Sequence, residues 1–508
     1  MTTVHLDGKS LTLQDVVNVA RKGYKVEIAP AAKEQIKECA ASVSEWVKEG
    51  RVVYGITTGF GDLASVVIPR DKGRQLQENL LLSHACGYGE PYPEDVVRAI
   101  MLLRINTLTR GFSGISLETL QQMVDYLNLG IHPVVPTQGS VGASGDLCPL
   151  SHVAISLIGH GEVVYKGQKM SASEALAKVG MKPVELQPKE GLALNNGTTV
   201  MNAVAALCIV DAMNMMKNAD VAASMSAEAL HAVPYAFDRR THDLRPQVGQ
   251  GVVAENIRRL IEGSEIIEAF KKDRVQDAYS LRCLPQVHGA SRDAIGYVKE
   301  KVEIEINSVT DNPIIFHKDG DAISGGNFHG QPMAMAMDFF GIAAAEFASI
   351  SERRVARLVD HKLSDLPPFL VSDSGVNSGF MIPQYTAAAI VSENKVLAHP
   401  SVVDSIPTSA NQEDHVSMGG YSARKGRQIL DNTNRVIAVE MVNAAQGMDF
   451  RAPLKPGKGS GAAFKEFRRH VPFYEKDQFM QPLLLKSLEL VENGTVVKAV
   501  EEAIGELK

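Results

Sequence analysis

Apolar residues recur at the spacing of one helical face through most of the chain from Asn196 onward. The stripes consist mainly of Ala, Met and Val, small and apolar residues that let helices approach closely in a bundle. Helices of about 25 to 30 residues exceed the usual mean of about 11 and favour an elongated bundle that associates with partners. The pattern predicts helices over residues 200–216, 219–231, 293–309, 333–359, 386–397 and 416–446.

The first part of the chain carries shorter patterns and the few strand signals. Residues 4–13 alternate around Asp7-Gly8, which predicts a hairpin, and Thr12 is placed to cap a helix that stops at Gly23. A second small hairpin is predicted around Lys166-Gly167. Residues 51–61 are strand-like at first and then have glycines where a mobile loop needs them. Further helices are predicted over residues 76–85 and 96–108, and another ends at about residue 158.

These patterns predict a mainly α protein, an elongated bundle of long helices with a smaller N-terminal region that contains short hairpins. No proline- or serine-rich linker and no low-complexity tract divides the 508 residues. We therefore expect a single unit over residues 1–508, subdivided approximately into residues 1–195 and 196–508.

The composition indicates which kind of partner and which cell compartment to expect. The net charge of −7 gives no basic footprint, so a small-molecule substrate is a better expectation than nucleic acid or an anionic membrane. Five scattered cysteines without a CxxC pair argue against a disulfide framework or a zinc site, and they favour a reducing cytoplasm. Residues 333–350 form the most apolar segment, and Asp338 and Glu346 make it too polar for a membrane span.

A glycine-rich turn opens the helix predicted to end at about residue 158, and it has two interpretations. Its glycines permit positive φ and Asp146 can cap the helix, which on composition alone is the better interpretation. The chemical alternative is that the Gly145 nitrogen attacks the Ala143 carbonyl and closes a five-membered ring. Dehydration of Ser144 then gives 4-methylidene-imidazol-5-one (MIO), an electrophile that ordinary side chains do not provide.

The setting of this turn favours the chemical interpretation. The run GSVGASGDLCPLSH at residues 139–152 resembles the signature of the MIO-dependent aromatic amino acid ammonia-lyases, and the resemblance extends from about Tyr54 to Glu413 and beyond. It implies an architecture like that of the fumarase and aspartase enzymes, with MIO formed from Ala143-Ser144-Gly145 and no metal or dissociable cofactor. It also implies a homotetramer in which several subunits build each active site.

The same resemblance assigns roles to further residues. Tyr54, in YGITTGFG, matches a catalytic base on a mobile lid, although taken alone it reads as a turn tyrosine. A phenol serves as a base at neutral pH only where nearby donors or positive charge stabilise its anion. Arg282, in VQDAYSLRC, corresponds to an arginine that pairs with the substrate carboxylate. Other residues implied to line the site or take part in catalysis are Asn196, Gln276, Tyr279 and Phe328.

Two positions indicate the substrate. Ser83-His84, in LLLSHACG, resembles the selectivity pair of histidine-specific members, and Glu413 supplies a carboxylate that lyases for phenylalanine and tyrosine lack. A phenylalanine ring would leave both polar groups unpaired, which can reject an analogue by roughly ten-thousandfold. The expected reaction is loss of ammonia from L-histidine to give trans-urocanate, the first step of histidine degradation.

Three rivals stay open at this point. A tyrosine or phenylalanine lyase or aminomutase of the same family is the first, because some tyrosine aminomutases also carry a Ser-His pair. A cofactor-free lyase of the fumarase type is the second, although its GSSxMPxKxN loop is missing. A non-catalytic helical assembly protein is the third.

Two residues depart from the family's pattern. Asn195 stands where an apolar residue is more usual, and it either alters the pocket floor or caps the next helix. Cys148 replaces a more usual alanine, and we expect it to pack as a small apolar residue.

Overall fold

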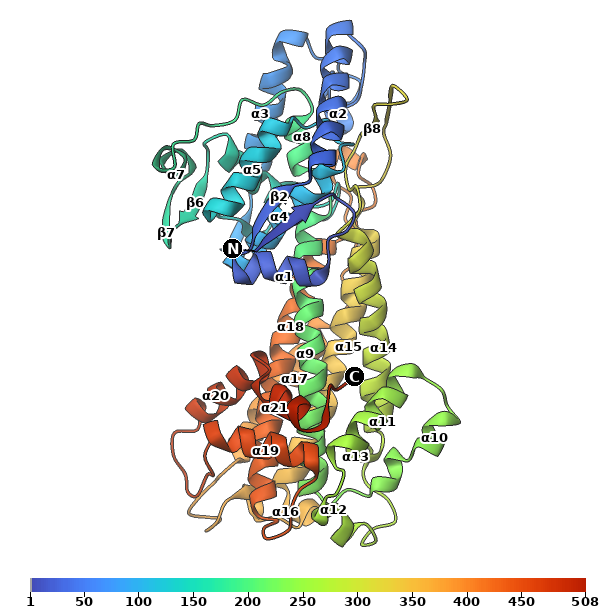
Figure 1. Cartoon of the computed structure of the whole chain (residues 1–508), viewed down its shortest axis with the longest axis vertical. Coiled ribbons are helices and arrows are strands. Elements are labelled where there is room, and N and C mark those ends of the chain that lie inside the picture. Colours follow the sequence, from blue (N-terminus) through green and yellow to red (C-terminus); the bar gives the residue numbers. More distant parts are fainter. Residues whose placement is uncertain (1) are drawn as a thin grey trace. The chain divides into compact units, whose positions relative to one another are not determined.

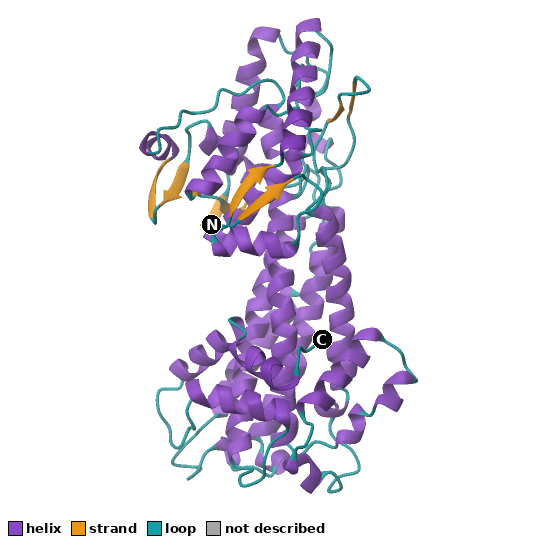
Figure 2. Cartoon of the chain, in the orientation of Figure 1, coloured by secondary structure: helices purple, strands orange, loops and turns teal. Residues whose placement is uncertain are grey.

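The computed structural model describes residues 2–508, and most of them are helical (Figures 1 and 2). Within these residues there are 21 α-helices and nine short strands, and the strands form four sheets of two or three strands each. This confirms the prediction of a mainly α protein with few strands.

The chain divides into two compact units, each assembled from separate stretches of sequence. Unit 1 contains Met1–Val210, Lys299–Asp338 and Pro400–Arg424, and unit 2 contains the remainder. Four of the five boundaries fall within the long helices α9 (Thr199–Ala229), α14 (Leu284–Glu305), α15 (Gln331–Val359) and α18 (Gly419–Asp449), and the fifth, between His399 and Pro400, lies outside the helices. The subdivision at residues 195 and 196 that we expected from the sequence therefore lies inside unit 1.

The start of unit 1 is a parallel strand–helix–strand motif, so the hairpin predicted around Asp7-Gly8 is wrong. Strand β1 (Thr3–Leu6) pairs in parallel with β2 (Lys25–Ile28), and α1 (Leu13–Lys22) connects them. The turn after β1 does not lead into an antiparallel strand. Its Gly8 N–H instead donates to the distant Asn106 Oδ1 at 3.1 Å. Thr12 caps α1 and Gly23 ends it, as predicted.

Around this motif, α4 forms the centre of unit 1. Every residue of α4 (Glu94–Thr109) from position 96 to its end is buried, and α1 and α5 (Leu117–Leu129) pack against it.

The predicted hairpin at Lys166-Gly167 is confirmed as β6 (Glu162–Tyr165) with β7 (Gln168–Ser171), and β4 (Ile131–Pro133) pairs with the other edge of β6. The other elements are α2 (Pro30–Glu49), α3 (Gly73–His84), α6 (Leu147–Leu157), α7 (Ala172–Lys178), α8 (Glu190–Asn195) and the pairs β3 (Tyr88–Pro91) with β5 (Pro136–Gln138) and β8 (Ile314–Phe316) with β9 (Asp321–Ile323).

Unit 2 is entirely helical in its regular structure, with a buried ion pair at its core. Arg354 donates to both carboxylate oxygens of Glu440, at 2.5 and 2.9 Å, and neither side chain is exposed. Hydroxyl groups of Ser226 and Ser351 also donate to Glu440, so that the buried charges are paired and hydrogen-bonded. Its shorter helices are α10 (Arg239–Asp243), α11 (Val248–Leu260), α12 (Glu265–Phe270), α13 (Tyr279–Arg282), α16 (His361–Ser364), α17 (Met381–Leu397), α19 (Lys458–His470), α20 (Gln481–Glu492) and α21 (Thr495–Ile504).

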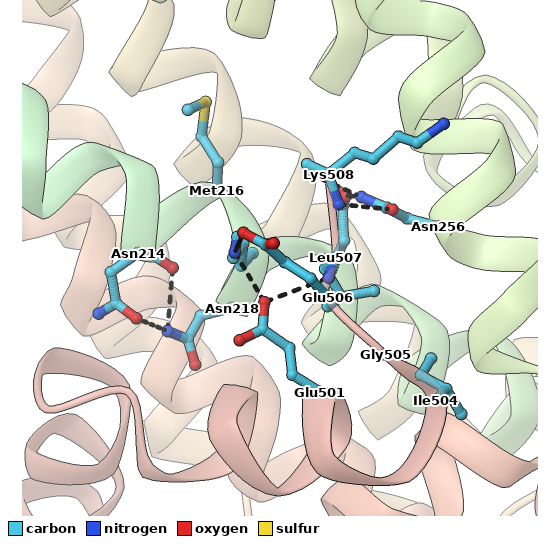
Figure 3. Close-up of polar contacts among 12 residues, drawn as sticks. Asn214, Met216, Asn218, Asn256, Glu501, Ile504, Gly505, Glu506, Leu507 and Lys508 are labelled. Carbon is cyan, nitrogen blue, oxygen red and sulfur yellow. Dashed lines mark hydrogen bonds and ion pairs between the residues drawn. The ribbon is translucent and has the colours of Figure 1, made fainter.

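The last residues of the chain are tied to unit 2 by polar contacts (Figure 3). The backbone N–H of Lys508 donates to Asn256 Oδ1 at 3.2 Å, and Asn256 Nδ2 donates back to the Lys508 carbonyl oxygen at 3.0 Å. The Leu507 N–H donates to the Glu501 carboxylate, and the Leu507 side chain is buried. This segment therefore packs as part of the unit.

Helix α9 is continuous, so the two helices predicted over residues 200–216 and 219–231 are wrong. The helix continues through Lys217 and Asn218, the polar residues between the two predicted helices. Lys217 forms an ion pair with Glu501 at 2.6 Å, and buried Asn218 donates to the carbonyls of Asn214 and Val491. Helix α14 begins earlier than predicted, with Pro285 in its first turn, where proline is tolerated.

Length and composition make α9 and α15 long and apolar enough to cross a membrane. Our argument that Asp338 and Glu346 exclude such a span in α15 was therefore wrong, because two acidic residues do not remove the apolar window. In the structure, 72% and 67% of the two windows are buried, as in the core helices of a globular protein.

Candidate active site

Seven of the residues singled out from the sequence meet in one cavity of unit 1. The cavity has a volume of about 810 Å³, and its wall also contains leucines from α3, α6 and α8. Its sequence-predicted lining residues are Tyr54, Ser83, His84, Ser144, Asn196, Phe328 and Glu413. Segments far apart in the sequence thus converge on one concave site that is partly apolar and partly polar, as ligand sites commonly are.

The Ala143-Ser144-Gly145 segment forms a tight turn against Gly197. Gly145 has φ of 70°, and a β-carbon added there would lie 2.0 Å from the Gly197 carbonyl oxygen. Gly197 N–H donates to the Ser144 carbonyl at 3.1 Å, and Asp146 N–H donates to the Gly197 carbonyl at 2.7 Å. The backbones of Ala143 and Gly145 also form a bridge to each other. The turn therefore brings these residues close together, and it needs glycine at position 145.

Asp146 anchors the turn in a way that the sequence did not suggest. It precedes α6, but its side chain makes no capping bond to that helix. Instead, Ser140 Oγ donates to Oδ1 at 3.0 Å, and Met201 N–H at the start of α9 donates to Oδ2 at 2.8 Å. Complete burial raises the pKa of Asp146 to about 6, although these hydrogen bonds act in the opposite direction. The carboxyl group ties the turn to a second helix.

A late segment of the chain closes over the same turn. Met418 N–H donates to the Val141 carbonyl at 2.9 Å, and Ser417 Oγ donates to the Gly142 carbonyl at 3.4 Å. These bonds satisfy carbonyl groups that an isolated loop would expose to water. The turn is therefore held from both sides.

Tyr54 lies in a series of turns, so the strand-like start predicted for residues 51–61 is wrong. The hydroxyl oxygens of Thr57 and Thr58 accept hydrogen bonds from the N–H groups of Val53 and Gly55, at 2.9 and 3.1 Å. Such local side-chain bonds compete with strand pairing. The Tyr54 hydroxyl is itself held in place, because Gly61 N–H donates to its oxygen at 3.0 Å.

Ser83 and His84 end helix α3 at the polar side of the cavity. Ser83 Oγ lies 3.0 Å from His84 Nδ1, and it donates to the Leu80 carbonyl at 3.1 Å. Because the hydroxyl hydrogen is engaged by Leu80, Nδ1 of His84 is assigned as the donor to Ser83. Burial lowers the pKa of His84, while the Leu80 carbonyl and the charge of Glu413 oppose the shift. This favours a neutral imidazole at neutral pH.

Glu413 reaches the cavity from a strained loop. Thr408 Oγ1 donates to Glu413 Oε2 at 2.9 Å, and the backbones of the two residues form a bridge. Three consecutive residues between them, Ser409 to Asn411, have positive φ values of 51°, 54° and 69°. Positive φ is costly for residues other than glycine and tends to occur at functional sites.

A buried network that the sequence did not reveal holds Asn196. Its Nδ2 donates to Asp311 Oδ1 at 3.3 Å and to the Asn312 carbonyl at 3.0 Å. Asp311 pairs with Lys189 Nζ at 2.8 Å, and neither side chain of the pair is exposed. Partners 122 positions apart leave no local pattern that could have identified this pair.

The loop around Phe328 is fixed by hydrogen bonds of its neighbours. His329 Nδ1 accepts from Gln331 N–H at 3.2 Å, and Nε2 lies 3.2 Å from the His415 carbonyl. Phe328 itself is half-buried and lines the cavity. Asn195 takes neither role considered for it, because it is buried at the end of α8 and donates to Ser151 Oγ at 3.1 Å.

Three predicted site residues lie in unit 2 and do not line this cavity. Gln276 is exposed, and Tyr279 is 70% exposed at the start of α13. The Arg282 guanidinium carbon lies 4.7 Å from the centre of the Tyr279 ring, and Arg282 Nε is buried without a hydrogen-bond partner. Among the residues described, the cavity wall contains no lysine or arginine to pair with an anionic ligand.

Over residues 2–508, no group of three or more His, Cys, Asp or Glu side chains could hold a metal ion. The donor groups that line the cavity are instead hydroxyl, amide, imidazole and carboxylate groups placed singly. The arrangement can bind a ligand that carries both an apolar part and hydrogen-bonding groups.

Comparison with known proteins gives consistent similarities. The sequence pattern described as "Aromatic amino acid lyase" matches residues 11–469. The chain is 53% identical over 504 residues to the histidine ammonia-lyase of Alkaliphilus oremlandii, covering 99% of both chains. The crystal structure of histidine ammonia-lyase from Trypanosoma cruzi superposes with a TM-score of 0.92 at 41% identity, over 99% of this chain and 96% of that one. Tyrosine aminomutase from Streptomyces globisporus gives 0.95 at 35% identity, over 100% of both chains.

Proposed function

The chain belongs to the aromatic amino acid lyase family, and from this membership we propose that it removes ammonia from L-histidine to give trans-urocanate. It is an ammonia-lyase, a carbon–nitrogen lyase of histidine metabolism. Greater identity to a histidine ammonia-lyase, 53%, than to a tyrosine aminomutase, 35%, supports histidine over the aromatic rivals.

The observation that carries the substrate assignment is the polar end of the cavity. His84 and Glu413 both line it, and Glu413 is close enough to influence the pKa of His84. An imidazole ring can exchange hydrogen bonds with a neutral histidine and a carboxylate, whereas a phenyl ring leaves both groups unpaired in a partly buried site. The cavity therefore favours a substrate with a polar ring.

The turn at Ala143-Ser144-Gly145 fits the formation of MIO. It is tight, it has no room for a β-carbon at Gly145, and Ser144 lines the cavity. The group supplies an electron sink for a substrate whose β C–H bond is only weakly acidic. The Gly197 N–H and the Asp146 side chain hold the turn in the conformation that brings the ring-forming residues together.

Tyr54 is the base that takes the β-proton of the substrate. Its oxygen already accepts a hydrogen bond from Gly61 N–H, which orients the hydroxyl and stabilises negative charge on it. Phe328 packs beside the substrate, and Asn196 is oriented by Asp311 and the Asn312 carbonyl to hydrogen-bond near the substrate's amino acid end. A positioned general base contributes roughly a hundredfold to ten-thousandfold.

Gln276, Tyr279 and Arg282 complete the site from other subunits of a cytoplasmic homotetramer. The absence of lysine or arginine from the described cavity wall leaves the substrate carboxylate without a cationic partner from unit 1. Arg282 can supply that partner through a planar, bidentate contact. Its exposed neighbour Tyr279 is available to a second copy of the chain.

The proposal is tested by incubating the full-length protein with L-histidine while following urocanate absorbance. We expect urocanate, together with an intact mass lower by two waters than the sequence mass. Ser144→Ala removes both signals, and Ser173→Ala, an exposed serine on α7, changes neither. Turnover of tyrosine without any urocanate would instead support an aminomutase.

The shared site is tested by mixing subunits. Ser144→Ala and Arg282→Met are each expected to be inactive as pure proteins. Denaturing and refolding them together restores part of the activity, because some sites then combine an intact turn with an intact arginine. No restoration, from a mixture that refolds to the size of the parent protein, contradicts sites shared in this way.

A further inference from the structure

Two cysteines that the proposed reaction does not use lie together behind the reactive turn. Cys86 is exposed and Cys148 is buried, and both line a second cavity of about 260 Å³ in unit 1. Cys86 is close enough to Cys148 to influence the pKa of the Cys148 thiol. The expectation that Cys148 packs only as a small apolar residue is therefore incomplete.

The pairing of β3 with β5 holds the two thiols in place. Cys86 and Gly87 directly precede β3, Gly139 directly follows β5, and Cys148 is the second residue of α6. A β-carbon on Gly139 would lie 2.6 Å from Cys148 Sγ, and one on Gly87 would lie 3.3 Å from the same atom. Side chains at these two glycines would crowd the Cys148 sulfur. The backbone around Gly87 and Gly139 therefore fixes the position of the Cys148 sulfur.

The donor set indicates which ligand such a pair can take. Zinc in structural sites requires four ligands, and over residues 2–508 no group of three or more metal-binding side chains occurs. A soft electrophile that two sulfur atoms satisfy is the better match. We propose that Cys86 and Cys148 form a binding site for trivalent arsenicals, in which one arsenic atom bridges the two sulfurs and the occupied site blocks histidine turnover.

The reaction proceeds in two balanced substitutions. Phenylarsonous acid, the hydrated form of phenylarsine oxide, first meets the exposed thiol of Cys86. A sulfur–arsenic bond forms, and the thiol proton leaves with one hydroxyl group as water. The Cys148 thiol then displaces the second hydroxyl group as a second water. Arsenic stays trivalent, so no oxidant or reductant is needed.

The pair is required because Cys148 is a poor nucleophile on its own. Burial raises its pKa to about 11, which keeps it protonated at neutral pH. An arsenic atom already attached to Cys86 makes the second substitution intramolecular, with a high effective concentration. The three other cysteines do not line this cavity: Cys39 and Cys208 are buried, and Cys283, half-buried, is in unit 2.

The second cavity shares part of its wall with the candidate active site. Ser83, His84 and Glu413 line both cavities, and Ala143 and Gly145 of the reactive turn line the second. A phenylarsenic group bound here occupies the polar end assigned to the imidazole ring. The inhibition therefore rests on the proposed function, whereas formation of the adduct does not.

The experiment treats the full-length protein with phenylarsine oxide and measures the intact mass and histidine turnover in the same samples. We expect one phenylarsenic group per chain, a parallel loss of turnover, and reversal of both by a small dithiol. Cys86→Ser and Cys148→Ala each need a roughly hundredfold higher concentration, because only one thiol remains. Cys283→Ser is the matched control and behaves like the parent protein.

Two results overturn the proposal. An adduct of equal yield in Cys86→Ser or Cys148→Ala excludes the bridged pair, and an adduct that leaves turnover unchanged excludes the block. Circular dichroism verifies that each variant folds, and Cys148→Ser replaces Cys148→Ala if the latter does not. Because the mass gain requires no catalysis, a protein that fails to turn over histidine still tests the dithiol site.

Discussion

The carbonyl oxygen of Gly197 occupies the space beside Gly145 in which any other residue would carry its β-carbon. The built β-carbon position lies 2.0 Å from that oxygen, and both residues have positive φ. Gly145→Ala must therefore displace backbone rather than a flexible side chain. We expect loss of histidine turnover and of the two-water mass deficit, with backbone strain costing roughly 1–3 kcal/mol in unfolding experiments.

Gly251→Ala is the matched control for that substitution. Gly251 lies within α11, where a β-carbon would meet nothing within 4 Å. Alanine is preferred to glycine inside a helix by about 1 kcal/mol, so this variant gains stability and keeps its activity. A Gly145→Ala protein with parental mass deficit and turnover would contradict the described turn.

Glu413→Gln tests whether the Glu413 carboxylate binds the substrate ring. The change keeps the shape of the side chain and removes its charge, so the charge-assisted hydrogen bond that we propose to the substrate imidazole is lost. Such bonds contribute about 1.5–3 kcal/mol, which corresponds to a fall of roughly 10- to 100-fold in kcat/KM for histidine. Asp414→Asn, at the exposed neighbouring position, leaves kcat/KM within twofold or so. Equal effects of the two substitutions would remove Glu413 from the binding site.

Tyr54→Phe tests the base. The ring stays in the loop, but the hydroxyl that accepts from Gly61 N–H is gone. We expect kcat to fall by roughly a hundredfold to ten-thousandfold, with a much smaller change in KM and no loss of the mass deficit. Tyr88→Phe is the control, since Tyr88 is exposed and lines neither cavity. A Tyr54→Phe enzyme with parental kcat would exclude the assigned role.

Glu228 makes the stability of the protein depend on pH. Burial raises its pKa to about 7, although it accepts hydrogen bonds from Gly457 N–H and Ser460 Oγ at 2.8 Å each. Between the unfolded value near 4.5 and the folded value near 7, only the folded state binds the proton. The stability contribution of this group is therefore complete below about pH 4.5 and is lost as the pH rises to 7. The loss is about 3 kcal/mol.

Glu228→Gln isolates this effect. The amide is neutral at every pH, so the difference in urea midpoint between pH 5 and pH 8 shrinks relative to the parent protein. Glu268→Gln, an exposed carboxylate in the same unit, leaves the difference unchanged. A parental slope in the Glu228→Gln protein would show that this carboxyl group does not titrate as its burial indicates.

Local signals in the sequence predicted local structure well. Thr12 and Gly23 bound α1 because a cap and a left-handed glycine act on adjacent residues, and the same holds for the turn at Lys166-Gly167. The turn at Asp7-Gly8 failed because its outcome depends on Asn106, which lies 98 positions away. The helix break expected near residue 217 is absent from α9, because Lys217 forms an ion pair with Glu501.

The residues of the candidate site also divide into those that a local motif identifies and those that only the fold brings together. Tyr54, Ser144 and Glu413 belong to motifs that a resemblance can identify, and the structure gathers them in one cavity. The Lys189–Asp311 pair behind Asn196 was missed, since neither residue stands in a pattern that marks it as buried. The thiol pair was missed for the same reason, because Cys86 and Cys148 meet only through the fold.

The bonds from Met418 and Ser417 to the reactive turn have a consequence for biosynthesis. The three residues proposed to form the ring leave the ribosome early, whereas the donors that fasten Val141 and Gly142 follow some 275 residues later. A nascent chain halted before position 400 contains the whole precursor sequence without its clamp. On the proposed function, we therefore expect the electrophile to mature only on the nearly finished polypeptide, so that incomplete translation products carry no reactive centre.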